Sequence, residues 1–479
     1  MNINYGDMGF KAGLEIHQQL DSKKLFCNCP SILRGDTPSF EIKRKLHTVA
    51  GESGEIDVAA EHEAALDREF VYQAYDTTCL VELDEEPPHE INKDALMTAL
   101  HISLLMNAKI IPISQIMRKT VIDGSNTGGF QRTVMIARDG FIETSYGNVR
   151  ILGIFLEEDS ARLVLKDEKS AVYRLDRLGI PLIEIATEPD LKNAEHAKET
   201  ALKIGEILRA CKVKRGIGTI RQDINISIKG SNRVELKGFQ DPKIMLKSIE
   251  EEVRRQLAYV GAGKKNSSEV RNVLPNGSSE FMRPMPGADR MYPETDLPLL
   301  KIPLDFINSA KKNLPRLREE IEEELRNQGL SQEYISILLK SNEIEKYKEL
   351  YYIVPKPNFV AKAVLVFPKE IAAKKGIAFE RVLEILDEHY FEVFNKVAQG
   401  KLKEEDVKHI FERLVDGKSF SEAAKLDKLS VNDLEEAVLK IMKSKPGLSE
   451  NAYMGLVMRE LRGKISGKEA SEIIKKLMH

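Results

Sequence analysis

The stretch 223–228 alternates strictly between polar residues and isoleucine. Successive side chains of a β-strand point to opposite faces of its sheet, so this pattern predicts a strand with one apolar face and one polar face that carries Asp223 and Asn225. After a short polar turn, Glu235 and Lys237 alternate with apolar residues in a second run. The sequence therefore predicts two neighbouring strands that present acid, amide and lysine side chains, a combination that suits a metal-bound phosphate.

Two other segments supply candidate metal ligands. Within 11–20, alternation places Glu15 and His17 together on the polar side of a predicted strand. Further along the chain, an apolar run ends abruptly in Glu157 and Glu158. Hard cations such as Mg²⁺ prefer carboxylate oxygens, so these residues are candidates for a magnesium site. The alternatives are an ordinary hydrogen-bonded pair for the first segment and a solvated turn for the second.

A loop rich in glycine and hydroxyl groups lies at 123–129. Its Ser125 and Thr127, together with backbone amides, are candidates to hold a phosphate or the terminal nucleotide of a nucleic acid, and a plain structural turn is the alternative. The chain has no G-x-x-x-x-G-K-[ST] sequence, hence no Walker-type nucleotide loop. It also lacks an evident arrangement for a nucleophilic serine.

The four cysteines leave two possibilities open. Zinc would need Cys27, Cys29 and Cys79 together with a ligand other than a thiol, for which Asp76 is a candidate. Buried free thiols are the alternative.

Composition and patterning predict an α+β chain of several domains. The 479 residues include 42% apolar residues, enough for sizeable cores. Strand-like runs dominate up to about residue 298, interrupted by helices predicted at 194–210 and 242–259, and helical periodicity follows. We therefore expect a mixed-sheet catalytic cradle at 1–298, a helical domain at 299–400 and a small all-α tail at 401–479.

The predicted helices of the C-terminal part begin with one capped by Asn313 that runs through Leu325. The others are expected at 331–340, 342–353, 378–398, 404–415, 431–443, 450–462 and 467–477.

Charge and hydropathy restrict location and partners. The chain shows no signal peptide and no apolar run of about eighteen residues, which predicts a cytoplasmic protein without membrane contact. A formal charge of −3 argues against general affinity for nucleic acid. RNA contact would need local basic surface, and residues 437–479 carry nine Lys or Arg against four Asp or Glu.

A series of motifs gives the chain a family resemblance. In order, they are GLEIHQQL, LFCNCP, YDTTCLVELDEEPP, VIDGSNTGGFQRT, LEEDSAR, YRLDRLGIPLIEIATEPD, KRGIGTIRQDINISIKG, RPMPGADRMYPETDLP and GLVMRELRGKISGKEASEIIKKLM. This succession resembles GatE of the archaeal-type glutamyl-tRNA(Gln) amidotransferase, in the GatB/GatE family. The bacterial and organellar GatB shares some of these blocks, but DGSNTGGFQRT and TIRQDINISIKG favour GatE.

The resemblance implies a ligase that uses ATP and Mg²⁺ to convert glutamyl-tRNA(Gln) into glutaminyl-tRNA(Gln) through a γ-glutamyl phosphate. It implies that ammonia comes from GatD, an asparaginase-like glutaminase partner, in a heterotetramer of two GatD and two GatE chains, and that the tail binds tRNA. The implied metal ligands, which also count among the catalytic residues, are Glu15, His17, Glu157 and Glu158. Asp223 and Lys237 complete the implied catalytic set, and Asn225 and Glu235 join Ser125 and Thr127 as candidate nucleotide contacts.

Several residues near these motifs have competing interpretations. Arg174, Asp176 and Arg177 are candidate contacts to the acyl end of the substrate, or else a structural Asp–Arg group. Glu184 lies in a predicted buried strand, where its charge demands a polar partner.

The chain departs from the resembled family in one region. GatE proteins carry an extra α/β domain, similar to one in bacterial-type aspartyl-tRNA synthetases, where this chain has only a predicted polar loop at 261–280. Two other functions stay open: a noncatalytic tRNA-binding or scaffold protein, and activity like that of GatB on aspartyl-tRNA(Asn).

Overall fold

The computed structural model describes residues 4–239, 242–287, 290–341, 343–425, 431–461 and 467–478. The chain divides into two compact units, Met1–Leu317 and Arg318–His479. None of the helices in the described ranges is both long enough and apolar enough to cross a membrane.

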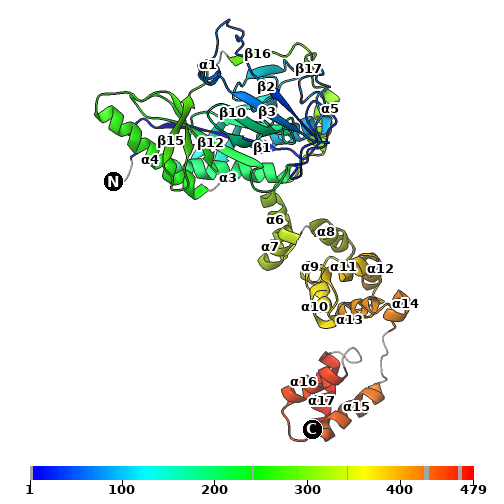
Figure 1. Cartoon of the computed structure of the whole chain (residues 1–479). Helices are drawn as coiled ribbons and strands as arrows, with labels where there is room; N and C mark the ends of the chain where they lie inside the picture. Colours follow the sequence, from blue (N-terminus) through cyan, green and yellow to red (C-terminus); the bar gives the residue numbers. More distant parts are fainter. Residues whose placement is uncertain are drawn as a thin grey trace. The chain divides into compact units, whose positions relative to one another are not determined.

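The first unit is built on one large mixed sheet (Figure 1). In spatial order its strands are β15 (Ser279–Pro284), β14 (Glu269–Val273), β13 (Val234–Phe239), β12 (Ile220–Ser227), β1 (Lys11–Gln19), β11 (Pro181–Thr187), β8 (Gly147–Glu158), β7 (Phe130–Thr144), β6 (Met117–Thr120) and β16 (Met291–Pro293), with β4 (Lys109–Ile110) also pairing with β7. Neighbours on this path are antiparallel except β13 and β14, which are parallel.

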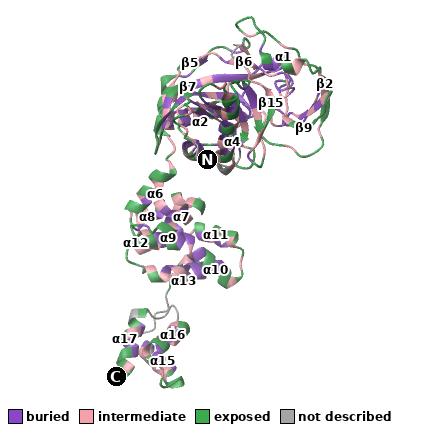
Figure 2. Ribbon diagram, turned by 90° about the vertical axis from the view of Figure 1, so that its left-hand side faces the viewer, coloured by how far each residue is buried: buried purple, intermediate pink, exposed green. Residues whose placement is uncertain are grey.

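One face of this sheet forms the main core. Ile224 and Ile226 of β12 are fully buried, as the alternation predicted. Three helices supply the facing apolar side chains: α2 (Lys93–Leu105) packs on β7 and β8, α3 (Ala194–Ala210) on β1 and β7, and α4 (Pro242–Gly261) on β12 and β13. Figure 2 shows the buried residues concentrated in the interior of this unit. Each isoleucine buried in this way contributes roughly 1.5–3 kcal/mol, so the apolar face fixes which face remains for polar side chains.

The two edge strands of the sheet are consecutive in sequence. Seven Cα–Cα steps connect Pro284 with Met291, and they span at most about 25 Å. Ten strands spaced about 4.8 Å apart in a flat sheet would place these edges roughly 43 Å apart. The sheet must therefore curl, with its polar face on the concave side.

Smaller sheets and helices complete the first unit. A four-stranded sheet with its own core has the order β2 (Phe40–Arg44), β3 (Glu69–Ala74), β10 (Ser170–Arg174) and β9 (Arg162–Lys166). A two-stranded sheet pairs β17 (Leu300–Lys301) with β5 (Ile113–Ser114). The remaining helices are α1 (Val58–Ala64) and α5 (Leu304–Lys312), and α5 packs against α2.

The second unit is helical and has two separate apolar cores. The first core joins α6 (Arg318–Asn327), α7 (Gln332–Ser341), α8 (Ile344–Ile353), α9 (Pro357–Leu365), α10 (Phe367–Lys375), α11 (Phe379–Asp387), α12 (Tyr390–Ala398), α13 (Glu404–Val415) and α14 (Phe420–Ala423). The second core joins α15 (Val431–Ser444), α16 (Glu450–Glu460) and α17 (Gly467–Met478).

The α+β fold class is confirmed, but three local predictions were wrong. Asn313 ends α5 instead of opening a helix, because its backbone amide donates to the Ser309 carbonyl, and the next helix begins only at Arg318. The single helix predicted at 378–398 is two helices, α11 and α12. The stretch 261–280, predicted as a polar loop, contains β14 and the beginning of β15.

The division predicted at residues 298 and 400 stays a prediction. Helix α13 belongs to the same packed core as α7–α12, on both sides of residue 400. Leu402, Val407 and Ile410 lie in this core together with Leu386. The last described core starts at Leu434.

Candidate active site

Charged side chains from several strands form a row across the concave face of the large sheet. Strand register creates this row, since paired residues on neighbouring strands share a face. Glu15 of β1 pairs with Asp223 of β12, and His17 of β1 pairs with Glu184 of β11. Glu157 of β8 continues the row on the far side of β11. Four strands distant in sequence thus bring together four carboxylates and an imidazole.

The imidazole of His17 lies at the centre of this row. Its Nε2 is 3.3 Å from Glu184 and 3.5 Å from Glu15. Glu15, His17 and Asp223 offer ligand atoms that lie within 4.8 Å of one another, and so do His17, Glu157 and Glu184. Both sets combine carboxylate oxygen with imidazole nitrogen, and the spacing allows a shared cation in either place.

Two lysines flank the acids. Lys119 of β6 lies 2.5 Å from Glu157 and 3.4 Å from Glu184, whereas Lys237 of β13 lies 2.6 Å from Asp223 and 2.5 Å from Glu235. Thr133 and Gln131 also donate to Glu157, at 2.7 and 3.0 Å. Five carboxylates therefore face two lysines and one histidine, so this part of the site carries an excess of negative charge that favours a cation.

Burial and neighbouring charges shift the acidities of these groups. Burial, with the added repulsion of Glu184, raises the pKa of Glu15 to about 7. Burial would also raise the pKa of Glu184, but the Lys119 ammonium and the hydrogen bond from His17 hold it well below its usual range. For His17, burial lowers the pKa, and the hydrogen bond and negative charge of Glu184 outweigh this effect and raise it. Such opposed shifts in adjacent acids are typical of functional sites.

The row of acids forms one wall of a cavity of about 200 Å³. Hydroxyl groups of Ser125 and Ser160 line another part of it. Three residues near the connection between β15 and β16 also line the cavity. Arg283 lies in β15, Pro286 follows that strand, and Arg290 directly precedes β16. The cavity thus combines metal-ligand chemistry with hydroxyls and cationic groups.

Most of the predicted site residues lie at this cavity or directly beside it. Glu15, His17, Glu157, Ser125, Glu235 and Lys237 line it, and Asp223 binds Lys237. Asn225 instead lines an adjacent cavity of about 430 Å³, which also has Glu15 in its wall.

Two of the predicted residues are directed elsewhere. Glu158 follows Glu157 directly on a strand and so points to the opposite face, where it accepts from Arg132 at 3.2 Å. Thr127 is buried and donates to the Glu82 carbonyl at 2.6 Å. Both side chains are used in holding the fold together.

Several residues that line the cavity were absent from the predicted set, among them Lys119, Glu184, Arg283 and Arg290. The sequence signalled Glu184 only as a buried acid in need of a partner, and that partner is His17. Lys119 lies in a strand of four residues, too short for a recognisable alternation. The two arginines reach the cavity only because the sheet curls.

The Arg174–Arg177 segment makes contacts within the fold. Asp176 is fully buried and accepts from Arg162 and from the backbone amide of Arg34. Arg177 donates to the carbonyls of Ser160 and Ala161. This group therefore fixes the loop that follows β8, while none of its members lines the cavity.

The cysteine cluster has a different fourth member from the one predicted. Asp76 pairs with Arg34, whereas Glu82 places a carboxylate oxygen within 4.8 Å of the sulfur atoms of Cys27, Cys29 and Cys79. Three thiolates and a carboxylate match the donors of a structural zinc site. The free-thiol alternative also fits, since the Cys27 thiol lies 2.8 Å from Glu82 and burial raises its pKa. Native mass spectrometry before and after chelation distinguishes the zinc site from free thiols. A zinc site loses the mass of one zinc ion on chelation, whereas free thiols show no change in mass.

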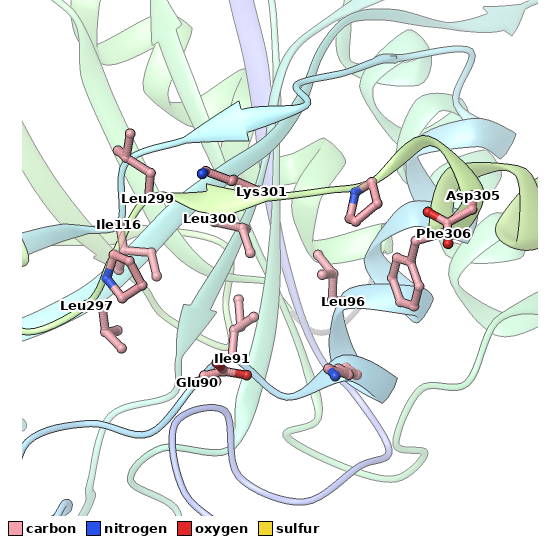
Figure 3. Close-up of a pocket in the computed structure, with 13 residues that line it drawn as sticks. Glu90, Ile91, Leu96, Ile116, Leu297, Leu299, Leu300, Lys301, Asp305 and Phe306 are labelled. Atoms are coloured by element: carbon pink, nitrogen blue, oxygen red, sulfur yellow. The ribbon is translucent and has the colours of Figure 1, made fainter.

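A third cavity of the first unit, about 350 Å³ in volume, is mainly apolar (Figure 3). Figure 3 shows Leu300 of β17 and Ile91 pointing toward each other across it, beside Leu96 of α2. Its walls hold no group of metal ligands among the residues that the structure describes. The chemistry is therefore assigned to the polar cavity.

Comparison with known proteins finds family matches over most of the chain. Residues 10–308 match the GatB/GatE catalytic domain, and residues 345–478 match the GatB domain. Among curated relatives named as E subunits of glutamyl-tRNA(Gln) amidotransferase, that of Methanocaldococcus jannaschii is 35% identical, with 99% of each chain covered. Those of Methanosarcina barkeri and Pyrococcus horikoshii are 32% and 33% identical, covering 99% and 95% of this chain and 98% and 93% of their own.

The alignments also bear on the missing insertion. The alignment with the Methanocaldococcus relative spans 629 positions, although this chain has 479 residues. The relative therefore contains a substantial length of chain that has no counterpart here. Despite this difference, the relative matches the chain over nearly its whole length. The chain therefore belongs to the GatB/GatE family and groups with its GatE members, the E subunits of glutamyl-tRNA(Gln) amidotransferase.

Proposed function

We propose that this chain is the ligase component that converts glutamyl-tRNA(Gln) to glutaminyl-tRNA(Gln), using ATP, Mg²⁺ and ammonia at the polar cavity. The observation that carries the proposal is the row of Glu15, His17, Glu184 and Glu157 across neighbouring strands, facing a wall with two arginines. A site with this distribution of charge suits a metal-bound polyphosphate.

The reaction has two steps. An oxygen of the γ-carboxylate attacks the γ-phosphorus of ATP, ADP leaves, and a γ-glutamyl phosphate results. Ammonia then attacks the acyl carbon, and phosphate departs with the former carboxylate oxygen. Lys119, 12% exposed, and Lys237 are placed to offset negative charge that develops during these steps.

Magnesium fits the donor set of the cavity. Glu15, His17 and Asp223 would hold the ion, and His17, Glu157 and Glu184 mark an alternative position, since the imidazole nitrogen can ligate only one ion at a time. When bound, the ion supplies charge neutralisation and orientation of the phosphate oxygens. Glu158 is not included, because it binds Arg132 on the opposite face.

The nitrogen donor and the tRNA contacts follow from the same assignment. The side-chain hydrogen bonds of the described residues pair no cysteine or serine of the cavity with a histidine or lysine, so this cavity offers no evident glutaminase nucleophile. As the resemblance to GatE implies, we infer that ammonia comes from GatD, the asparaginase-like glutaminase, in a heterotetramer of two GatD and two GatE chains. The segment that forms α15–α17 carries exposed basic residues for contacts with tRNA phosphates, among them Lys440, Lys443, Lys445 and Arg459. Arg462 and Lys464, from the same predicted surface, lie outside the described residues.

The test is to compare nitrogen sources with the purified chain. With charged tRNA, ATP and Mg²⁺, we expect glutaminyl-tRNA to form when ammonium chloride is supplied and not when glutamine is supplied alone. The ammonium-dependent rate is expected to rise with pH, because only unprotonated ammonia attacks the acyl phosphate. Product from glutamine without any partner would contradict the assigned division of labour.

The same assay separates the two other functions. A noncatalytic scaffold would bind tRNA and yield no product with either nitrogen source. Equal amidation of aspartyl-tRNA(Asn) would indicate activity like that of GatB.

A further inference from the structure

Two arginines of the cavity have no acidic partner among the described residues. Most buried or half-buried arginines of the first unit are paired: Arg118 and Arg132 bind Glu294, and Arg221 binds Asp159. Arg283 and Arg290, in contrast, form no ion pair with any carboxylate in the described ranges. The Nε atom of Arg283 is buried without a hydrogen-bond partner.

The connection from β15 to β16 brings both arginines to the same cavity. Arg283 lies on β15 opposite Val270, which in turn pairs with Glu235 of β13. Arg290 directly precedes Met291, whose register partner on β6 is Lys119. One arginine therefore approaches the row of acids from the Glu235 side and the other from the Lys119 side.

The local charges leave these arginines available for an anion. The nearest acids of the row are already engaged, since Lys119 binds Glu157 and Glu184, and Lys237 binds Asp223 and Glu235. A buried guanidinium N–H without an acceptor is costly, so an anionic ligand gains from pairing with it. Guanidinium groups match phosphate oxygens with two parallel hydrogen bonds. Hydroxyls of Ser125 and Ser160 in the same cavity add further donors.

We propose that Arg283 and Arg290 form a phosphate-binding subsite that holds phosphoryl oxygens of the nucleotide opposite the row of carboxylates. The identity of the nucleotide rests on the proposed function, whereas the subsite rests on the two arginines themselves. A cation on the acids and guanidinium groups on the other wall would grip a polyphosphate from both sides. The same phosphate chemistry could also come from the acceptor end of tRNA, so the experiment has an arm for each source.

The experiment measures binding to the full chain by calorimetry, with Mg²⁺ and either ATP or inorganic pyrophosphate as probe. Arg283→Gln, Arg290→Gln and the double variant are compared with Arg254→Gln, which removes an exposed arginine of α4 that pairs with Glu250 and Glu251. Each charged contact is worth about 1.5–3 kcal/mol, so each single variant is expected to bind the probes about 10- to 100-fold more weakly. The control variant is expected to bind like the unmodified chain. Circular dichroism checks that each variant is folded.

A parallel arm measures uncharged tRNA by filter binding. Unchanged tRNA affinity with weakened ATP and pyrophosphate binding supports the nucleotide subsite. Loss of tRNA affinity alone would assign the arginines to tRNA phosphate and overturn the nucleotide assignment. Equal affinity of the double variant for all three probes would overturn the subsite itself. If the unmodified chain binds pyrophosphate but not ATP, the proposed function fails while the subsite stands; if it binds neither, both fail.

Discussion

Replacing Glu157 with Gln is expected to lower ammonium-dependent amidation by about 100-fold or more, comparable to the loss of one strong electrostatic contact in an active site. The substitution preserves the shape of a side chain that is 1% exposed and removes its charge. It also turns the charged acceptor for Lys119 at 2.5 Å into a neutral one and removes one of the acids clustered around His17. The affinity for tRNA is expected to change only a few fold, because the site of chemistry is altered and the second unit is not.

The matched control is Glu143→Gln. Glu143 is an exposed residue of β7 that undergoes the same chemical change outside the cavity. We expect its amidation rate to equal that of the unmodified chain. A Glu157→Gln variant with full ATP turnover would contradict the assignment of this face as the site of phosphoryl transfer.

Replacing Glu294 with Ala is expected to destabilise the first unit by about 3–5 kcal/mol, the usual cost of removing one partner from a buried ion pair. Glu294 is 1% exposed and accepts from Arg118 at 2.6 Å and from Arg132 at 2.8 Å. Arg132 is itself buried and also binds Glu158. The alanine variant would leave Arg132 with only part of its compensating charge.

Hydrogen exchange followed by mass spectrometry measures this effect locally. Peptides from β6, β7 and β16 are expected to lose protection, while peptides from α9–α13 in the second unit serve as an internal control. Burial tends to raise the pKa of Glu294, but the hydrogen bonds from Arg118 and the charge of Arg132 lower it. Because the folded-state pKa is depressed, this stabilisation is present at neutral pH and is lost as the pH falls below the pKa of an ordinary glutamate, about 4.3. Unchanged protection of β6 and β7 in the variant would contradict the structural role of Glu294.

The sequence predicted the local pattern of the site but not its register. Alternation identified the polar side of β12 and the pairing of Glu15 with His17 on one side of β1, because a strand repeats every two residues. The same rule, applied to the adjacent pair Glu157 and Glu158, separates them onto opposite faces once a strand extends through both. The prediction let the apolar run end before these two acids, and side chains beyond the end of a strand are not held to alternate faces.

Contacts made over long sequence distances could not be predicted from local patterns. His17 meets Glu184 only through the pairing of β1 with β11, and Arg132 meets Glu294 across 162 residues. Arg283 and Arg290 reach the cavity because the sheet curls until its edge strands approach each other. The position of Asn313 at the end of α5, and not at the start of the next helix, was mispredicted for a related reason. Asparagine suits either end of a helix, and the packing of α5 on α2 decides which end it takes.

The most direct test of the central claim follows an oxygen atom from substrate to product. Glutamyl-tRNA(Gln) labelled with ¹⁸O in the γ-carboxylate is incubated with the chain, ATP, Mg²⁺ and ammonium chloride, and the inorganic phosphate is analysed by mass spectrometry. If the γ-carboxylate is activated as an acyl phosphate, each amidation transfers one labelled oxygen to phosphate. Amidated product accompanied by phosphate without the label would contradict the proposed chemistry of this site.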